Sequence, residues 1–300
     1  MNRTLKIATM FIAIALFAST GCKKKEETPV PADANIQASE DNSQMEGEFN
    51  SVYDFAEDVG NNQQGVKGSG KTNGWWKLTP CATITILDTM SATKKISITF
   101  NPDTTGLVRD GCLCHDGRTR KGSIDMEFTG KMKDAGSTVK ATLKDNYHVY
   151  LNGGWVKHTG TKTIKNITTN WLRPKFENVV TNATAVTLTG TITWNATRTL
   201  EKTDETIFDW LDDKYEIGGS SSGTNRQGHN FTCNITQNLK IKVGCKFIYA
   251  GKWSLNNTST NQSMELDYNP GGVIPEPCDD QADVTYTVGG QSRTKRITIR

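Results

Sequence analysis

The sequence contains no apolar run long enough to cross a lipid bilayer. Its longest such run, Ile7–Ala18, has twelve residues, whereas a membrane-spanning helix needs about twenty. Only four histidines are present, and their spacing excludes the HExxH pattern of zinc proteases. Neither sign of charge predominates, since 35 Lys and Arg residues stand against 32 Asp and Glu residues. The chain therefore lacks the basic excess that favours nucleic acid or another polyanion as a partner.

The short apolar run is placed as in a secretory signal peptide. Arg3 and Lys6 precede it, and it ends in the small residues "STG" before Cys22. This order resembles the lipobox of bacterial lipoproteins. The resemblance implies that residues 1–21 are removed as a signal peptide and that Cys22 carries the lipid. Ser19 stands where that family usually has Leu, so an ordinary cleaved signal, with Cys22 incidental, stays open as an alternative.

A short charge run, "KKKEE", follows Cys22. Its Lys25, Glu26 and Glu27 resemble the Lys-acidic-acidic tag that directs lipoproteins of the Bacteroidota to the outer face of the outer membrane. The resemblance implies a protein anchored by lipid to a bacterial outer membrane, on its periplasmic or its cell-surface face. The alternative is a solvated charge run on a flexible tether.

Residues 22–74 are predicted to be mainly a tether, because they are polar and rich in Pro, Asn, Gln, Gly and Ser. Within them, residues 44–60 carry apolar residues at spacings of four and three, which predicts a short amphipathic helix. Its apolar face consists of Met45, Phe49, Val52, Ala56 and Val59, and its polar residues include Glu46, Glu48, Asp54, Glu57 and Asp58. An acidic face is repelled by anionic lipid, so we expect the helix to dock on the rest of the protein.

Residues 75–300 are predicted to form an all-β domain. Segments such as "ATITILD", "KISITFN", "AVTLTGTITW" and "RITIR" alternate apolar and polar residues and are separated by Gly, Asn and Asp turns. Short turns force neighbouring strands to be antiparallel. We therefore expect an antiparallel multi-stranded sheet, either an open curved sheet or a sandwich, preceded by the tether and the short helix.

A weak internal repeat relates residues 81–130 to residues 245–300. In each, a cysteine precedes a strand, a second strand ends in an aromatic residue and Asn-Pro, and another cysteine stands thirty-three residues after the first. The tether, the helix and the cysteine-bounded Thr-rich strands together resemble the uncharacterised all-β lipoproteins common in the Bacteroidota. The resemblance covers nearly the whole chain and implies a cell-envelope location without a known activity.

With Cys22 assigned to the lipid, an even number of cysteines is left, which favours disulfides in an exported chain. These are Cys81, Cys112, Cys114, Cys233, Cys245 and Cys278. The repeat predicts the pairs Cys81–Cys114 and Cys245–Cys278. It leaves Cys112 and Cys233 to pair with each other or to stay free.

A zinc site is the competing interpretation of the first cysteine group. Cys81, Cys112, Cys114 and His115 offer the thiolates and the imidazole that zinc prefers. The C-x-C-H order lacks the usual gap of two to four residues between ligands, and an exported protein favours disulfides. We therefore predict no metal site and no cofactor.

Two further motifs are interpreted as linker and loop. "GVKGSGKT", Gly65–Thr72, matches the phosphate-loop pattern, but no strand is predicted before it and no helix after it, so we expect no nucleotide binding. Gly219, Ser221 and Gly223 match the G-x-S-x-G pattern of serine hydrolases, but they lie in a Gly/Ser/Asn segment that we interpret as a flexible loop. No catalytic residue is therefore predicted.

Two classes of function remain. The seven tryptophans, among them Trp155, Trp194 and Trp253, are candidates for an exposed platform that binds a glycan or a protein, although most Trp residues of a β domain belong to its core. The favoured hypothesis is a non-catalytic binding or structural module of the cell envelope. The alternative is an envelope hydrolase whose site residues are dispersed in the sequence and meet only in the fold.

Overall fold

The computed structural model describes residues 34–61, 81–88, 93–101, 110–205, 213–242, 245, 248–260, 262–276, 278–288 and 291–298. The chain divides into two units, Met1–Ala32 and Asp33–Arg300, and the described residues all belong to the second. The predicted signal peptide, Cys22, the "GVKGSGKT" motif and Trp75-Trp76 lie outside the described residues. What we infer about them from the sequence therefore stays a prediction.

The described part of the chain consists of one helix and fifteen strands, so the all-β prediction is confirmed. The helix is α1 (Ala34–Asn61), and the strands are β1 (Ala82–Asp88), β2 (Lys94–Phe100), β3 (Cys112–Leu113), β4 (Thr119–Phe128), β5 (Thr138–Leu143), β6 (His148–Leu151), β7 (Gly154–Asn166), β8 (Lys175–Thr187), β9 (Gly190–Lys202), β10 (Lys214–Thr224), β11 (Asn230–Lys242), β12 (Ala250–Asn257), β13 (Gln262–Asp267), β14 (Gln281–Val288) and β15 (Gln291–Thr298).

All fifteen strands belong to one antiparallel sheet. Its order, β1-β2-β4-β5-β7-β8-β9-β10-β11-β12-β13-β14-β15, follows the order of the chain, with β3 paired to β4 and β6 paired to β4 and β7. Such a meander is the expected result of short turns, because each strand pairs with the one just formed. Of the two predicted forms, the structure therefore has the single sheet and not the sandwich.

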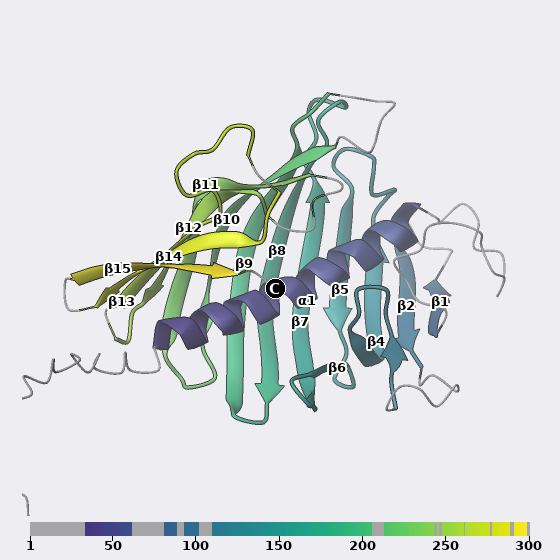
Figure 1. The fold of residues 1–300 in the computed structure, drawn as a ribbon. Coiled ribbons are helices and arrows are strands. Elements are labelled where there is room, and N and C mark those ends of the chain that lie inside the picture. Colours follow the sequence, from purple (N-terminus) through teal and green to yellow (C-terminus); the bar gives the residue numbers. More distant parts are fainter. Residues whose placement is uncertain are drawn as a thin grey trace, which may run out of the picture. The chain divides into compact units, whose positions relative to one another are not determined.

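The helix α1 lies across one face of this sheet (Figure 1). Its apolar stripe, Met45, Phe49, Val52, Ala56 and Val59, is fully buried, which confirms the prediction that the helix docks on the body of the protein. Along its length α1 contacts β5, β7, β9, β12 and β13. The sheet thus supplies the apolar surface that the helix needs to be stable.

The helix is longer than predicted, because it begins at Ala34 and not at residue 44. The seven strand spacings from β5 to β13 cover about 34 Å. A helix of 28 residues spans about 42 Å, whereas the predicted segment 44–60 spans only about 26 Å. The added turns carry polar residues that are buried, among them Asp41 and Asn42, and apolar periodicity does not detect these.

Several acidic residues of α1 face the sheet and not the solvent. Glu48 is completely buried, and both of its carboxylate oxygens accept hydrogen bonds from Arg120 on β4, each at 3.1 Å. Arg118 donates at 2.9 Å to Glu48 Oε2, and the Tyr147 hydroxyl donates to Oε1. Toward the start of the helix, the Asp41 carboxylate accepts from the backbone and the guanidinium of Arg226. These contacts fix where along the sheet the helix lies.

The charge of Arg120 controls the ionisation of Glu48. Burial by itself raises the pKa of this carboxyl, but the charges of Arg120 and Arg118 outweigh burial and lower the pKa to about 2. Arg120 also donates to Asp116 at 2.8 and 2.6 Å. Glu48 and Arg120 are therefore both charged and both buried, which is favourable only while their partners are present.

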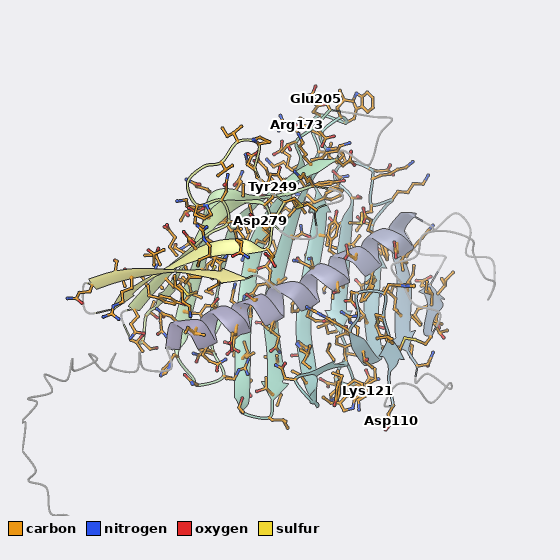
Figure 2. The ribbon with its side chains drawn as sticks, in the orientation of Figure 1. Asp110, Lys121, Arg173, Glu205, Tyr249 and Asp279 are labelled. Carbon is orange, nitrogen blue, oxygen red and sulfur yellow. A yellow bond between two sulfur atoms is a disulfide. The ribbon has the colours of Figure 1, made fainter. Side chains whose placement is uncertain are left out.

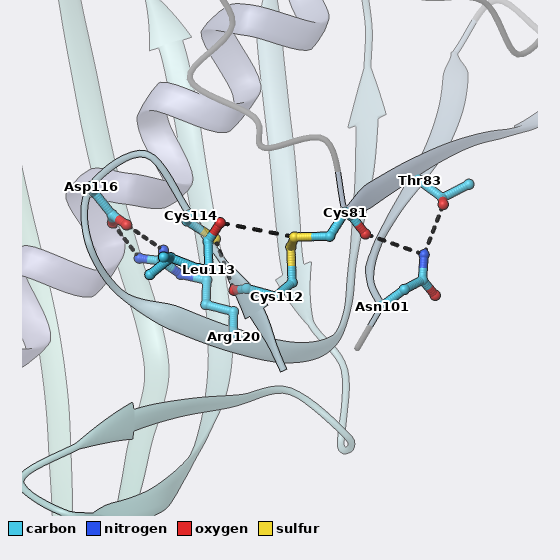
Figure 3. Close-up of a disulfide and its surroundings, with 8 residues drawn as sticks. All are labelled: Cys81, Thr83, Asn101, Cys112, Leu113, Cys114, Asp116 and Arg120. Carbon is cyan, nitrogen blue, oxygen red and sulfur yellow. Dashed lines mark hydrogen bonds and ion pairs between the residues drawn. A yellow bond between two sulfur atoms is a disulfide. The ribbon is translucent and has the colours of Figure 1, made fainter. Parts of the chain in front are cut away.

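The structure contains two disulfides, Cys81–Cys112 and Cys245–Cys278. The second was predicted, and it is confirmed. The prediction of Cys81–Cys114 is wrong, because Cys112 and not Cys114 is the partner of Cys81 (Figure 3). Cys114 and Cys233 are free thiols, and both are buried.

The short strand β3 explains why the equal spacing of the cysteines was misleading. Cys112 pairs with Arg120 in the β3–β4 ladder, which places its Cα 5.6 Å from that of Cys81. Cys114 lies beyond β3 and begins a tight turn, in which its backbone N–H donates to the Arg118 carbonyl. Burial raises the pKa of the Cys114 thiol, although nearby Arg120 opposes the shift. The second copy of the internal repeat, residues 245–300, has no strand equivalent to β3 among its described residues.

We predict that Glu48→Gln destabilises the fold by about 3 kcal/mol, because it leaves the buried charge of Arg120 without its main counter-charge. The matched control is Glu127→Gln, whose carboxylate lies 3.6 Å from Lys95 in a pair with both side chains nearly half exposed; its cost should stay below about 1 kcal/mol. Urea unfolding of the purified protein measures both. Equal losses from the two variants would show that the buried pair does not anchor the helix.

The same variant should change the acid sensitivity of the protein. Folding lowers the pKa of Glu48 from 4.5 to about 2, so its stabilising contribution is complete above pH 4.5 and is lost as the pH falls toward 2. Unfolding free energies measured between pH 5 and pH 2 should therefore fall less steeply in Glu48→Gln than in the parent protein. The expectation fails if the two profiles are parallel.

We also predict that peptide mapping without reduction finds Cys81 joined to Cys112 and Cys245 joined to Cys278. Cys114 and Cys233 should react with iodoacetamide only after denaturation, because both are buried. A peptide that joins Cys81 to Cys114 would contradict the structure.

Candidate functional site

The side of α1 that faces β7–β11 lines a cavity of about 400 Å³ that is partly open to solvent, and we call it cavity 1. Aromatic and aliphatic side chains form most of its wall, with a few charged groups between them. The lining residues are Glu46, Phe49, Asn50, Tyr53, Asp54 and Glu57 of α1, and Lys162, Asn178, Val180, Trp194, Ala196, Arg198, Thr199, Leu200, Tyr215, Ile217 and Ile241 of the sheet. The volume lies within the range usual for small-molecule sites.

The floor of cavity 1 follows from the alternation of side chains along β9. Trp194, Ala196 and Arg198 are buried beneath α1, whereas Asn195 and Thr197 between them are exposed on the other face. The Trp194 ring stacks on Phe49 of the helix, with centroids 5.7 Å apart. Ala196 pairs with Val180 of β8, and these small side chains leave a space under the helix that Trp194 does not fill.

Lys162 of β7 brings a positive charge to this wall. The side chain is 3 % exposed, and its Nζ donates a hydrogen bond at 2.8 Å to the Phe49 carbonyl of α1. The ammonium also lies 5.4 Å from the centre of the Tyr53 ring. Burial lowers the pKa of Lys162 to about 8, although the charges of Glu46 and Asp54 oppose the shift. At neutral pH, Lys162 is therefore protonated in most of the molecules.

The second cation of cavity 1, Arg198, is already paired. Its Nη2 donates at 2.8 Å to Glu46 Oε2, and its Nε lies 3.2 Å from both oxygens of that carboxylate. Arg198 also donates at 3.2 Å to the Ser221 hydroxyl, which in turn donates at 2.7 Å to Asn42 Oδ1. Glu46 and Arg198 therefore neutralise each other at the edge of the cavity.

These contacts correct the interpretation of the G-x-S-x-G segment as a flexible loop. Gly219, Ser221 and Gly223 lie inside strand β10, and Ser221 is buried. A Cβ at Gly219, whose φ is +118°, would lie 2.1 Å from the Thr197 carbonyl oxygen, so the glycine permits close approach to β9. A hydrolase elbow needs a turn from a strand into a helix, and the structure has a continuous strand here.

A second cavity, of about 740 Å³, lies beside the first and is called cavity 2. Tyr53, Glu57, Leu200 and Tyr215 line both cavities. The rest of its wall comes from the β4–β5 connection, from the β7–β8 connection and from strand ends. These residues are Met132, Lys133, Asp134, Ala135, Asn166, Thr168, Thr169, Trp171, Pro174, Phe176 and Lys202. The shared residues make the two cavities neighbours along α1.

Cavity 2 lies at the end of the sheet where β7 connects to β8. Arg173 from this connection and Glu205 from the β9–β10 connection lie at the same end of the sheet in Figure 2. Trp171, in the β7–β8 connection, is 71 % exposed although it lines the cavity. A large aromatic side chain that borders a cavity and faces the solvent is available for contact with a ligand.

Three carboxylates line cavity 1, and they bear on the hydrolase alternative. Glu46 is held by Arg198, as described above, while Asp54 and Glu57 stand near the two tyrosines of the wall. Burial, with the charges of Glu57 and Asp54, raises the pKa of Tyr53 well above its usual value. Burial and the charge of Asp213 likewise raise the pKa of Tyr215. Tyrosines that keep their protons therefore line the cavity beside these carboxylates and supply no nucleophile.

The residues predicted from motifs do not meet at this site. Cys81 and Cys112 are joined in a disulfide, which removes two of the four proposed zinc ligands. Within the described segments, no cluster of three or more His, Cys, Asp or Glu side chains could hold a metal ion. Trp194 and Trp253 are buried, and Trp155 lies under Lys121, whose Nζ is 4.2 Å from the ring centre. These tryptophans do not form the exposed platform that was considered for a glycan.

No motif includes Lys162 or Arg198, although the alternation of residues in their strands indicates both. In "TKTIKN", Lys162 is two residues before Ile164 and so lies on the same face of the strand. In "TWNATRTL", Arg198 lies on the same face as Trp194 and Ala196 for the same reason. A charged residue at an inward position of an alternating strand is either paired or functional, because burying it alone is costly. In this chain the same rule also points to Arg120.

Comparison with protein-family models, with curated proteins and with solved structures finds no match to this chain. No helix among the described residues combines the length and the apolar character that a membrane span requires. The cavities themselves are therefore the main guide to function.

Proposed function

We propose that this protein is a non-catalytic binding module of the bacterial cell envelope that holds a small apolar or amphiphilic ligand between α1 and the sheet. The observation that carries the proposal is the pair of adjacent cavities, of about 400 and 740 Å³. Both spaces are partly open to solvent, so a ligand can reach them. Concave, mainly apolar pockets of this size with a few polar groups are the usual sites of small-molecule binding.

The walls favour an apolar ligand over a glycan. Phe49, Trp194, Leu200 and Ile217 present aromatic and aliphatic surface to cavity 1. Burying this surface against a hydrocarbon gains about 25 cal/mol per Å², and a sugar, whose surface is largely hydroxyl groups, obtains only part of this gain.

The location is part of the same proposal. The signal-like segment that ends at Cys22 supports lipid attachment at this cysteine, and "KKKEE" supports the outer membrane. The resemblance to all-β lipoproteins of the Bacteroidota agrees with this address. A lipid anchor and a tether would let the cavities sample ligands close to the membrane surface.

An envelope hydrolase is the alternative, supported by the carboxylates of Asp54 and Glu57 in cavity 1. A general acid and base must both reach the reacting bond. Glu46, the third carboxylate, is engaged by Arg198, and the lining of cavity 1 includes neither Ser nor Cys. These features support binding over catalysis.

We predict that Ala196→Phe weakens the binding of the neutral fluorescent probe N-phenyl-1-naphthylamine at least tenfold, because the new ring occupies cavity 1. Thr197→Phe is the matched control, since the neighbouring side chain is exposed on the opposite face of β9, and it should leave the affinity unchanged. Fluorescence titration measures binding, and thermal melting should show both variants folded. Undiminished probe binding in Ala196→Phe would sink the proposed cavity.

We further predict that Cys22→Ala abolishes metabolic labelling with palmitate and releases the full-length protein from the membrane fraction of a Bacteroidota host. Cys233→Ala removes a buried thiol and should leave labelling and fractionation unchanged. Palmitate labelling that persists in Cys22→Ala would refute lipid attachment at this residue.

A further inference from the structure

The chemistry of Lys162 identifies the class of ligand more narrowly, provided that the cavities bind one as proposed above. The side chain arises from β7 between two strands that offer small neighbours, with Ala141 of β5 and Val180 of β8 directly opposite it. Its long stem therefore has room to reach up to α1, and its Nζ meets the Phe49 carbonyl. This position sets a cation into a mainly apolar wall.

The ammonium group is only partly satisfied by the protein. It has three N–H donors, and one of them serves the Phe49 carbonyl at 2.8 Å. Among the residues that the structure describes, Lys162 forms no ion pair with a carboxylate, since Glu46 is taken up by Arg198. Buried ammonium groups are normally paired. Lys162 lines cavity 1, so its remaining donors are available to a ligand there.

The other charges of the cavity limit what that ligand can be. Glu46 and Arg198 cancel each other, while Asp54 and Glu57 line the same space and repel any anion, so a negative charge is tolerated only in direct contact with Lys162. A dianionic phosphate is therefore disfavoured, and a single negative charge that pairs with Lys162 is favoured. The tail attached to this charge meets Phe49, Trp194, Ala196, Leu200 and Ile217, which suit a hydrocarbon chain.

We propose that cavity 1 binds a long-chain carboxylate, with the carboxylate on Lys162 Nζ and the chain along the apolar floor of β8, β9 and β10. Burial makes this pair strong, because a charge-assisted hydrogen bond in a low-dielectric site is about twice as strong as a neutral one. Cavity 2 shares Leu200 and Tyr215 with cavity 1, so it can receive the distal end of a long chain.

The test compares hexadecanoate with its neutral methyl ester, each titrated by displacement of N-phenyl-1-naphthylamine below micellar concentrations. The full-length protein should bind hexadecanoate at least tenfold more tightly than methyl hexadecanoate. Lys162→Met, which keeps the length of the side chain but removes the charge, should abolish this preference while the ester binds as before. Lys165→Met, which alters an exposed lysine on the same strand, should keep the preference.

The outcomes separate this inference from the proposed function. If neither compound binds the parent protein, both fail. If both bind equally well, or if Lys162→Met keeps the preference for hexadecanoate, the ligand class is wrong while the cavity proposal stands. Should Lys162→Met not fold, Lys162→Gln, which can still donate to the Phe49 carbonyl, replaces it under the same criteria.

Discussion

The buried ion pair between Glu48 and Arg120 is the constraint on which the arrangement of the molecule depends. An apolar helix stripe can slide or rotate on an apolar sheet at little cost, because hydrophobic attraction has no direction. A carboxylate that must meet a guanidinium does not allow this freedom. Glu48 reaches Arg120 with both of its oxygens, so the central turn of α1 has one position over β4. The pair contributes specificity more than net stability, since its desolvation cost is large.

The position of α1 in turn determines the cavities. Phe49 stacks on Trp194, and one turn later Tyr53 meets Phe176 edge to face, with centroids 5.9 Å apart. These two ring contacts hold the helix away from the smaller side chains of the sheet. Between them the floor is made of Val180 and Ala196, which are too small to fill the gap. A shift of the helix by one residue would close this space or expose it, so the ion pair and the cavities belong to one arrangement.

The sequence predicts the parts of this fold that rest on periodicity, but not those that rest on pairing. The alternation of β9 and the apolar stripe around Met45 are local patterns, so the sheet and the docking of α1 could be foreseen. The start of the helix could not, because its first turns are buried through polar contacts such as Asp41 with Arg226. The partner of Cys81 depended on β3, a strand of two residues that no periodicity can reveal. The candidate site depends on Lys162, which becomes notable only once its inward position is known.

Buried charged groups with a carboxylate partner stabilise the fold, whereas a buried charge without one indicates a function. Arg120 meets Glu48 and Asp116, Arg198 meets Glu46, and Arg226 meets Asp41. Each of these buried or partly buried guanidinium groups is thus explained by the stability of the fold.

Two buried groups on the inner face of β7 are different. His158 Nε2 has no hydrogen-bond partner within the described segments, and burial lowers the pKa of this ring, despite the charge of Glu48. The imidazole therefore stays neutral, and an unmet nitrogen costs little compared with an unmet charge. Lys162 keeps its charge in the same environment with one carbonyl as its hydrogen-bond acceptor. Folding alone gives no reason to place an ammonium there, because a Leu or Met would fill the position at lower cost. A ligand that brings the missing negative charge does give one.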